Sequence, residues 1–302
     1  MGQQKLPPQP KNPSISVLMA VYAGTNPAYF DCAFASILRQ THPAHEIVIV
    51  FDGPIPDPVE QSIDKTAKNV TSPPIKVVRC NNNKGLGHAL HEGVAACSGE
   101  FILRMDDDDI SVPDRIALQV ETLRADGDID VLGGQIIELR NDSAPKMRSV
   151  PLAHDDIKRG MQTRNRINHV TVLMRRATVV AAGNYDTTIR AGFEDYELWH
   201  RMLFYGAMFK NIDRTLVIVR FDHRQISRRS GIAYLYEEWN IHHHFWQAGY
   251  TTTMTLLTAM LMRVIPRLLP KFMMSFIYDR ALRQPLNKEQ HRSYLNLLKD
   301  YE

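Results

Sequence analysis

The sequence predicts an α/β protein with a doubly wound mixed sheet, followed by a C-terminal helical region. Two observations predict this class. First, short and nearly all-apolar segments alternate with amphipathic segments through the first half of the chain. Second, polar residues follow several of these apolar segments directly, as they do where buried parallel strands end at a ligand site.

Composition limits the possible classes of function. The chain has 302 residues, of which 44% are hydrophobic, so it can bury a substantial core as one large or two smaller domains. A net charge of +3 is too small to indicate nucleic acid as a partner. Cys32, Cys80 and Cys97 lack metal-binding spacing and indicate core or free thiols of a reducing compartment.

The N-terminal residues 1–13 are polar and rich in proline, which predicts a flexible tail rather than a signal peptide. No uninterrupted apolar run reaches about 18 residues, so we expect no membrane-spanning helix. The sequence shows no internal repeat.

Four buried strands are expected in the first half, over residues 15–21, 46–51, 75–79 and 100–105. Helices are expected between them: one capped by Asn26 with Pro27 in its first turn, a polar helix within 56–68, and one over 87–97. Ser111 is expected to cap the next helix, with Pro113 in its first turn.

Further strands are expected over 129–139, 168–174 and 215–221. Gly133-Gly134 indicates a bend or bulge in the first of them. Gly192 and Phe193 precede a helix that begins with Glu194 and Asp195, and a basic loop over 222–231 ends this part of the chain.

Asp106 to Asp109 are four consecutive carboxylates at the end of the fourth strand. They repel one another, so they are not placed together for stability. Open α/β sheets bind ligands at this end of their strands, and hard divalent cations prefer such oxygens. The alternative is a solvated acidic turn.

Two other strand ends carry groups suited to a nucleotide, namely Asp52 and the Lys84-Gly85 turn. These groups converge with the acidic cluster if their strands are parallel neighbours. Gly85 and Gly87 alone are weak signals, since two glycines before a helix are usual in ordinary turns, and neither GxGxxG nor GxxxxGK is present here.

Together these motifs resemble the family-2 glycosyltransferases, which have the type-A nucleotide-sugar fold. The resemblance is greatest to bacterial enzymes of exopolysaccharide and O-antigen synthesis, such as those of amylovoran biosynthesis. It implies a catalytic domain over residues 14–231. The segments that carry it are Ile15–Val21, Ser36–Thr41, Val48–Gly53, Asn83–Gly87, Arg104–Asp109 and Gly192–Arg201.

The resemblance implies roles for matching residues. Asp52 would contact a uridine base, Asp106 would lie near the ribose and diphosphate, and Asp108 would ligate Mg²⁺ or Mn²⁺. Asp195 would be the catalytic base, with Glu194 beside it. Many members carry two acidic residues where this chain has Phe51-Asp52, so the nucleobase stays open. The residues predicted to line the nucleotide-sugar site are Val21, Asp52, Lys84, Gly85, Arg104, Asp106, Asp107, Arg228 and Arg229.

Several of these assignments leave alternatives. Lys84 or the Arg228-Arg229 loop would clamp phosphate, but the loop also fits a solvated basic turn. His223 is either a third metal ligand beside Asp106 and Asp108 or an ordinary loop histidine. His169 and Trp199 are candidates for contact with the acceptor.

The predicted activity is inverting, metal-dependent transfer of a sugar from a nucleotide donor, a UDP-sugar, to a hydroxyl of a lipid-diphosphate-linked saccharide. Two alternatives stay open: a phosphatase that uses the strand-end aspartates, and a non-catalytic metal- or nucleotide-binding domain. Ser111 and Ala117 exclude an EF-hand, and Ile110 excludes a DDxxD prenyl site.

Residues 232–302 form the C-terminal region, which we expect to be helical. Arg263, Arg267 and Lys271 are spaced by four in an apolar stretch, which predicts peripheral contact with the inner, cytoplasmic face of an anionic membrane. The alternative is a helical pair that packs on the catalytic domain.

Overall fold

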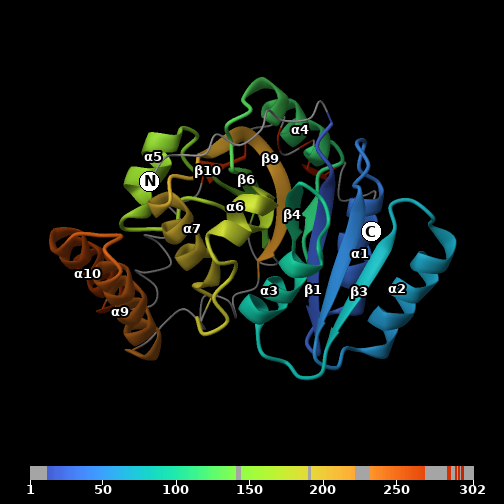
Figure 1. Ribbon diagram of the computed structural model, residues 1–302, viewed down its shortest axis with the longest axis horizontal. Coiled ribbons are helices and arrows are strands. Elements are labelled where there is room, and N and C mark those ends of the chain that lie inside the picture. Colours follow the sequence, from blue (N-terminus) through green and yellow to red (C-terminus); the bar gives the residue numbers. More distant parts are fainter. Residues whose placement is uncertain are drawn as a thin grey trace.

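A computed structural model describes residues 12–140, 144–189, 192–221, 232–268 and 284–286, with the separate positions 290, 292, 294 and 295. Figure 1 shows a central sheet with helices on both faces. The main path of the sheet runs in the order β10-β7-β6-β8-β4-β1-β2-β3. The predicted α/β class with a mixed sheet is confirmed.

The first half of the chain forms the parallel part of the sheet. The order is β4-β1-β2-β3, and the neighbouring pairs are all parallel. Every residue of β2 is buried, as expected for a strand covered on both faces. The bounds are Ile15–Tyr22 for β1, Glu46–Asp52 for β2, Ile75–Cys80 for β3 and Phe101–Met105 for β4.

Alternate residues of β1 contribute to two cores, one on each face of the sheet. Val17 and Met19 pack with helices α1, α2 and α4, whereas Leu18 packs with α3, α6 and α7. A sheet with helices packed on both faces in this way is called doubly wound. The bounds are Pro27–Leu38 for α1, Asp57–Asn69 for α2, Leu86–Ala96 for α3, Arg115–Ala125 for α4, Arg176–Ala181 for α6 and Glu194–Phe204 for α7.

The second half extends the sheet with antiparallel and crossing strands. β8 is antiparallel to both β4 and β6, and β9 is parallel to β6. The register of β6 and β9 shifts next to Gly134, which confirms the predicted irregularity. The bounds are Val131–Arg140 for β6, Lys146–Arg148 for β7, His154–Met161 for α5, Leu173–Arg175 for β8, Phe209–Phe221 for β9 and Gln284–Pro285 for β10.

Two local predictions were wrong. Ser111 does not cap a helix: Ile110–Ser111 is a short strand, β5, that pairs with β9, and α4 begins only at Arg115. Residues 169–171 form a 3-10 helix, η1, instead of the start of a strand. In both places a distant partner overrides the local pattern. The backbone N–H of Ser111 donates to Ser36 Oγ, and the backbone N–H of Gly134 donates to Thr171 Oγ1.

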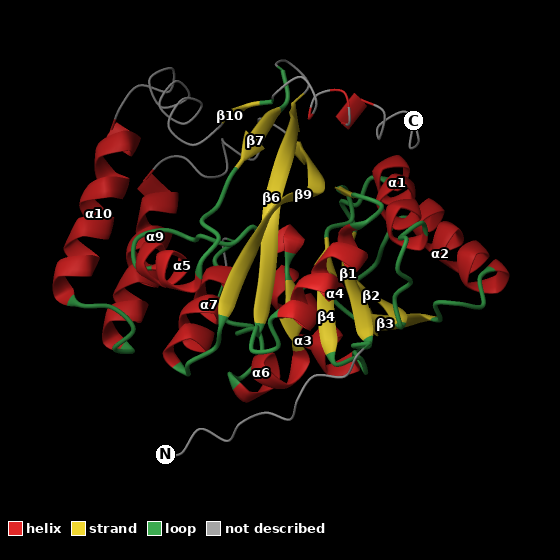
Figure 2. Cartoon of the chain, turned by 90° about the horizontal axis from the view of Figure 1, so that it is seen from above, coloured by secondary structure: helices red, strands yellow, loops and turns green. Residues whose placement is uncertain are grey.

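The C-terminal region begins with two helices that lie side by side, α9 (Ile232–Gln247) and α10 (Thr253–Leu268). Figure 2 shows them at one end of the molecule, where Ile241 and Phe245 of α9 join the core that includes α7. Neither of these helices, nor any other helix among the described residues, has the length and apolar character of a membrane-spanning segment.

Arg263 of α10 faces inward. Its guanidinium pairs with the fully buried Glu238 of α9 at 2.6 Å and donates to the backbone carbonyl of Thr163 at 3.1 Å. The prediction that Arg263 faces a membrane is therefore wrong. The side chains of Arg267 and Lys271 lie outside the described residues.

Candidate active site

The carboxyl ends of the parallel strands meet at one edge of the sheet. In the register, Tyr22 lies beside Asp52 and Asp52 beside Cys80, while Met105 at the end of β4 pairs with Met19. The acidic cluster follows Met105 directly. The tertiary structure thus brings Asp52 and the cluster to the same edge, as the sequence predicted.

Asp52 is bound to the turn that follows β3. Its carboxylate accepts hydrogen bonds from the backbone N–H groups of Lys84, at 2.8 Å, and Gly85, at 2.9 Å. A Cβ at Gly53 would lie 2.6 Å from the backbone nitrogen of Asn83, so this position requires glycine. The turn before α3 is consequently held against the end of β2.

That turn is open on its outer side. Gly85 has a φ of +95°, and a Cβ built there would meet nothing within 4 Å. Lys84, next to Gly85, is exposed. Val21 is fully buried, so its side chain supports the end of β1 rather than facing a ligand.

Arg104 and three of the aspartates are tied to different parts of the fold. The buried Arg104 pairs with Asp106, its Nη1 donating to Oδ2 at 2.7 Å. Asp107 accepts the hydroxyl of Thr25, which follows β1. Asp109 accepts the backbone N–H of Arg220 at 2.9 Å.

The residues fit a divalent cation. Asp106, Asp108 and Asp109 each offer one carboxylate oxygen, and these oxygens lie within 4.8 Å of one another. Burial, followed by the charges of Asp106 and Asp107, raises the pKa of Asp108 to about 7, and burial raises the pKa of Asp107 to about 6. A cation would relieve this repulsion, and hard oxygen ligands suit Mg²⁺ or Mn²⁺.

The sequence named Asp106 and Asp108 as metal ligands and left open which of Asp106 to Asp109 would touch the ion; the structure places carboxylate oxygens of Asp106, Asp108 and Asp109 close together, so their role as ligands stays a prediction. His223, Arg228 and Arg229 lie outside the described residues, so the structure says nothing about their predicted roles. Arg115 was missed: it is fully buried behind the cluster, where it donates to the backbone carbonyl of Arg104 at 2.9 Å. Burial and the nearby charge of Arg104 lower its pKa to about 9.

Asp195 is the second residue of helix α7 and is buried, with 9% of its surface exposed. Asn165, on the loop after α5, donates its amide to Asp195 Oδ2 at 2.8 Å, and the backbone N–H of Tyr196 donates to Oδ1 at 2.7 Å. His169 Nδ1 lies 3.9 Å from the same Oδ2. The predicted inward orientation of Asp195 is confirmed, and the contact from Asn165 was missed because that residue lies in an unpatterned polar stretch.

Glu194 is also buried and lies against the start of α3. Burial, followed by the charge of Asp195, raises its pKa to about 7. A Cβ at Gly87 would lie 3.3 Å from the Cβ of Glu194, so the starts of α3 and α7 approach closely. The glycine was a weak signal in the sequence, and its role here is to allow this approach.

His169 and Trp199, the predicted acceptor contacts, behave differently. His169 is largely buried and its Nε2 lies 2.8 Å from the hydroxyl of Tyr185. Trp199 is fully buried and packs edge-on against His169 and Phe209. The prediction that Trp199 touches the acceptor is wrong in this structure, since a buried ring offers it no surface.

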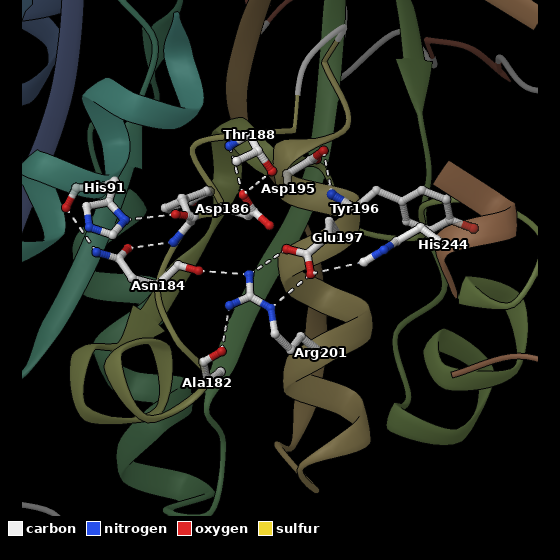
Figure 3. Close-up of polar contacts among 11 residues, drawn as sticks. His91, Ala182, Asn184, Asp186, Thr188, Asp195, Tyr196, Glu197, Arg201 and His244 are labelled. Atoms are coloured by element: carbon white, nitrogen blue, oxygen red, sulfur yellow. Dashed lines mark hydrogen bonds and ion pairs between the residues drawn. The ribbon is translucent and has the colours of Figure 1, made fainter. Parts of the chain in front are cut away.

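The loop before α7 is anchored on both sides (Figure 3). Arg201 of α7 donates to the backbone carbonyls of Ala182, at 2.6 Å, and Asn184, at 2.8 Å, while Glu197 pairs with the same guanidinium. On the other side, Asn184 donates to the carbonyl of His91 in α3 at 3.0 Å. This loop fixes where Tyr185 sits relative to α7.

The mixed α/β sheet covered by helices on both faces is the fold of the type-A class of nucleotide-sugar glycosyltransferases. The chain belongs to glycosyltransferase family 2: the family model "Glycosyl transferase family 2" matches residues 16–182. It is a glycosyltransferase.

Relatives match over nearly the whole chain. An "Uncharacterized glycosyltransferase" of Haemophilus influenzae is 33% identical over 271 residues, which is 89% of this chain and 99% of the relative. The "UDP-Gal:alpha-D-GlcNAc-diphosphoundecaprenol beta-1,3-galactosyltransferase" of Escherichia coli is 29% identical over 90% of this chain and 98% of its own length. The "Amylovoran biosynthesis glycosyltransferase AmsE" of Erwinia amylovora is 29% identical over 88% and 98%.

Solved structures share the fold. The mannosyltransferase PcManGT of Pyrobaculum calidifontis, in complex with GDP-Man and Mn²⁺, superposes with a TM-score of 0.58 at 15% identity, covering 98% of this chain and 87% of that one. Residues 1–349 of S. aureus TarS in complex with UDP give a TM-score of 0.56 at 15% identity, covering 95% and 80%.

Proposed function

We propose that this enzyme transfers a sugar, with inversion, from a UDP-sugar to a hydroxyl of a lipid-diphosphate-linked saccharide during synthesis of a surface polysaccharide. The observation that carries the proposal is the set of three carboxylates within 4.8 Å of one another at the sheet edge that also holds Asp52 and the Lys84–Gly85 turn. The Escherichia coli relative, whose name gives a UDP-sugar donor and a diphosphoundecaprenol-linked acceptor, supports this choice of substrates.

The donor would lie across the strand ends. Asp52 and the exposed Lys84 would face the nucleotide and its phosphates, and the backbone at Gly85 would allow close approach. Asp106 and Asp108 would hold Mn²⁺ or Mg²⁺, with Asp109 on their inner side. A bound divalent ion neutralises the negative charge that develops on a departing diphosphate.

Asp195 would take the proton of the acceptor hydroxyl as that oxygen attacks the sugar. A hydroxyl is a poor nucleophile until a carboxylate removes its proton. Attack from the side opposite the diphosphate inverts the configuration at the sugar carbon. The buried, hydrogen-bonded state of Asp195 keeps the carboxylate oriented for this step.

A lipid-linked acceptor would place the enzyme at the cytoplasmic face of the membrane as a peripheral protein. Met254, Leu257 and Leu261 of α10 are spaced along one side of the helix and are 72%, 59% and 62% exposed. Such an exposed apolar stripe on an outer helix fits contact with lipid. This stripe replaces Arg263 as the feature that supports membrane contact.

The test is a panel of nucleotide-sugars in a thermal-shift assay, with Mn²⁺ and with EDTA, followed by a transfer assay with UDP-galactose and a synthetic GlcNAc-diphosphate lipid. We expect UDP-sugars to raise the melting temperature only with the metal present. Release of inorganic phosphate without sugar transfer would instead support the phosphatase alternative, and binding without turnover would support the non-catalytic one.

A further inference from the structure

We propose that Tyr185 fixes His169 in the tautomer that carries its proton on Nδ1, and that this N–H holds Asp195 ionised as the base. Tyr185 and His169 are thus positioning residues that act through Asp195. The inference rests on the proposed function of Asp195 as the base, and its test separates the two.

The first step is the contact between the phenol and the imidazole. Tyr185 Oη lies 2.8 Å from His169 Nε2, whereas its other polar neighbour, Met174 Sδ, is 3.9 Å away. The hydroxyl proton goes to the better acceptor at the shorter distance, which is an imidazole lone pair rather than a thioether. Nε2 therefore accepts, and in a neutral ring the proton sits on Nδ1.

The second step is the neutrality of the ring. His169 is largely buried, and burial followed by the positive charge of Arg104 holds its pKa well below its usual range. A neutral imidazole carries one N–H proton, so when Nε2 accepts a hydrogen bond, Nδ1 carries the proton. Tyr185 itself keeps its proton, because burial raises the pKa of the phenol.

The third step is the orientation of Nδ1 toward the carboxylate. Nδ1 lies 3.9 Å from Asp195 Oδ2, too far for a hydrogen bond but close enough for the N–H dipole to stabilise a negative charge. The opposite tautomer would point a lone pair at the carboxylate and would favour its protonated form.

Asn165 supports the same oxygen. The backbone N–H of Ile167 donates to Asn165 Oδ1 at 3.0 Å, which turns the amide nitrogen toward Asp195 Oδ2. Charged or titratable groups around Asp195 include Glu194 and Tyr196 on its own helix, and Arg104 and Asp106 at the end of β4, which act on Tyr185 and Glu194. Arg166, next to Asn165 in the sequence, acts on Tyr196. Glu194 and Asp195 are neighbouring carboxyl groups at the start of α7, and the charge of Asp195 helps to raise the pKa of Glu194, so the oriented N–H groups offset a repulsion between like charges.

The position of Tyr185 is itself fixed by the fold. His91 of α3 contacts the backbone carbonyl of Tyr185 at 2.8 Å, and Asn184, which has a φ of +61°, accepts the N–H of Tyr185 with its side chain. Trp199 closes the other side of the His169 ring. The phenol and the imidazole therefore have little freedom to separate.

The decisive variant is Tyr185→Phe, which keeps the ring and removes the hydroxyl. Tyr196→Phe is the matched control: it also removes a buried tyrosine hydroxyl, whose described hydrogen bond is to the carbonyl of Met161 at 2.6 Å, and it leaves in place the backbone N–H that binds Asp195. Both variants should lose similar stability, so melting temperature corrects for any general effect.

Two measurements follow. Nitrogen NMR of ¹⁵N-histidine-labelled protein, with the signal assigned by His169→Asn, should show a proton on Nδ1 in the native protein and in Tyr196→Phe, and its loss from Nδ1 in Tyr185→Phe. The second measurement is the pH profile of kcat/KM with UDP-galactose, Mn²⁺ and the GlcNAc-diphosphate lipid, followed as UDP release. The apparent pKa of the acid limb of this profile should be about 0.5 to 1 pH unit higher in Tyr185→Phe than in the native protein, the size expected for one oriented dipole. The KM for UDP-galactose should change less than about twofold, since in the proposed arrangement these groups act on the base and not on the donor.

His169→Asn tests rescue. Asparagine places an amide N–H near the position of Nδ1, so it should retain more turnover than His169→Leu, which offers no donor. A native-like Nδ1 proton in Tyr185→Phe, or an acid limb that coincides with that of Tyr196→Phe, would overturn the inference while leaving Asp195 as the base. Native turnover by Asp195→Asn would overturn the proposed base, and this inference with it.

Discussion

Asp52 binds the backbone N–H groups of both Lys84 and Gly85, so a single carboxylate joins the end of β2 to the turn before α3. Asp52 is 4% exposed and lies 32 residues before Lys84 in the sequence. Any contact that Asp52 makes with a nucleobase would be an addition to this structural role.

Replacing Asp52 with alanine removes both of these acceptors. We expect the free energy of unfolding to fall by about 1–3 kcal/mol, because two N–H groups lose their partner, and the KM for the donor to rise as the turn loosens. Urea denaturation measures the first effect. Asp31→Ala is the control, since its carboxylate accepts only an exposed bond from Ser62 among the contacts described, and it should cost under about 0.5 kcal/mol. Equal midpoints for the two variants would contradict the role of Asp52.

The acidic cluster predicts a pH dependence of stability. Burial and neighbouring charges raise the folded-state pKa of Asp108 to about 7, well above that of an unfolded carboxyl. A group with a raised pKa stabilises the fold while protonated and loses that contribution as pH rises through about 7. The pKa values of Asp107 and Glu194 are raised in the same direction.

We therefore expect the melting temperature in EDTA to fall between about pH 5 and pH 8, and Mn²⁺ to raise it more at pH 8 than at pH 6, because metal and proton compete for the carboxylates. Asp108→Asn should flatten the EDTA profile and weaken the response to Mn²⁺. It should also nearly abolish transfer. Full activity of native protein in excess EDTA would remove the metal from the proposal.

Asp195→Asn keeps the size of the side chain and removes its basicity. Turnover should fall on the order of 10²–10⁴-fold with the affinity for the UDP-sugar unchanged, because the base acts on the acceptor and not on the donor. Asparagine can still accept the N–H of Tyr196 but loses the bond from the Asn165 amide, so we expect melting temperature to fall by a few degrees only. Turnover within a few-fold of native would exclude Asp195, and Glu194 would be tested next in the same way.

We expect the ion pair between Arg263 and Glu238 to stabilise the packing of helices α9 and α10. Glu238 is fully buried, so Arg263→Leu leaves its charge without this guanidinium and should cost about 3–5 kcal/mol. The double variant Arg263→Leu with Glu238→Leu should recover much of that loss, since no buried charge then stays behind. A double variant no more stable than Arg263→Leu would show that the pair contributes little.

The apolar stripe of α10 predicts membrane binding. Leu257→Glu with Leu261→Glu should reduce co-sedimentation with liposomes that contain anionic lipid, because two exposed apolar side chains become charged. Phe204→Glu with Tyr205→Glu is the control, since these residues are also exposed, at 58% and 69%, but belong to the end of α7 and the turn after it. Equal loss in both variants would mean that added negative charge, rather than the stripe, accounts for the effect.

The sequence by itself determined the strands, most helix starts and the acidic cluster at a strand end. These features depend on local signals: apolar runs for β1 and β2, the cap at Asn26, and carboxylates that directly follow β4. The same signals placed Asp195 at the start of a helix with its side chain turned inward.

The tertiary structure alone decided which partner each polar group has. Asp109 bonds a backbone group 111 residues away, Ser111 joins a strand instead of capping a helix, and Arg263 turns inward to Glu238. Tyr185 and Asn165 reach the surroundings of Asp195 from loops that carry no periodic pattern. Local propensity cannot reveal such partners, because packing of distant segments fixes them and a buried polar group takes whichever partner that packing supplies.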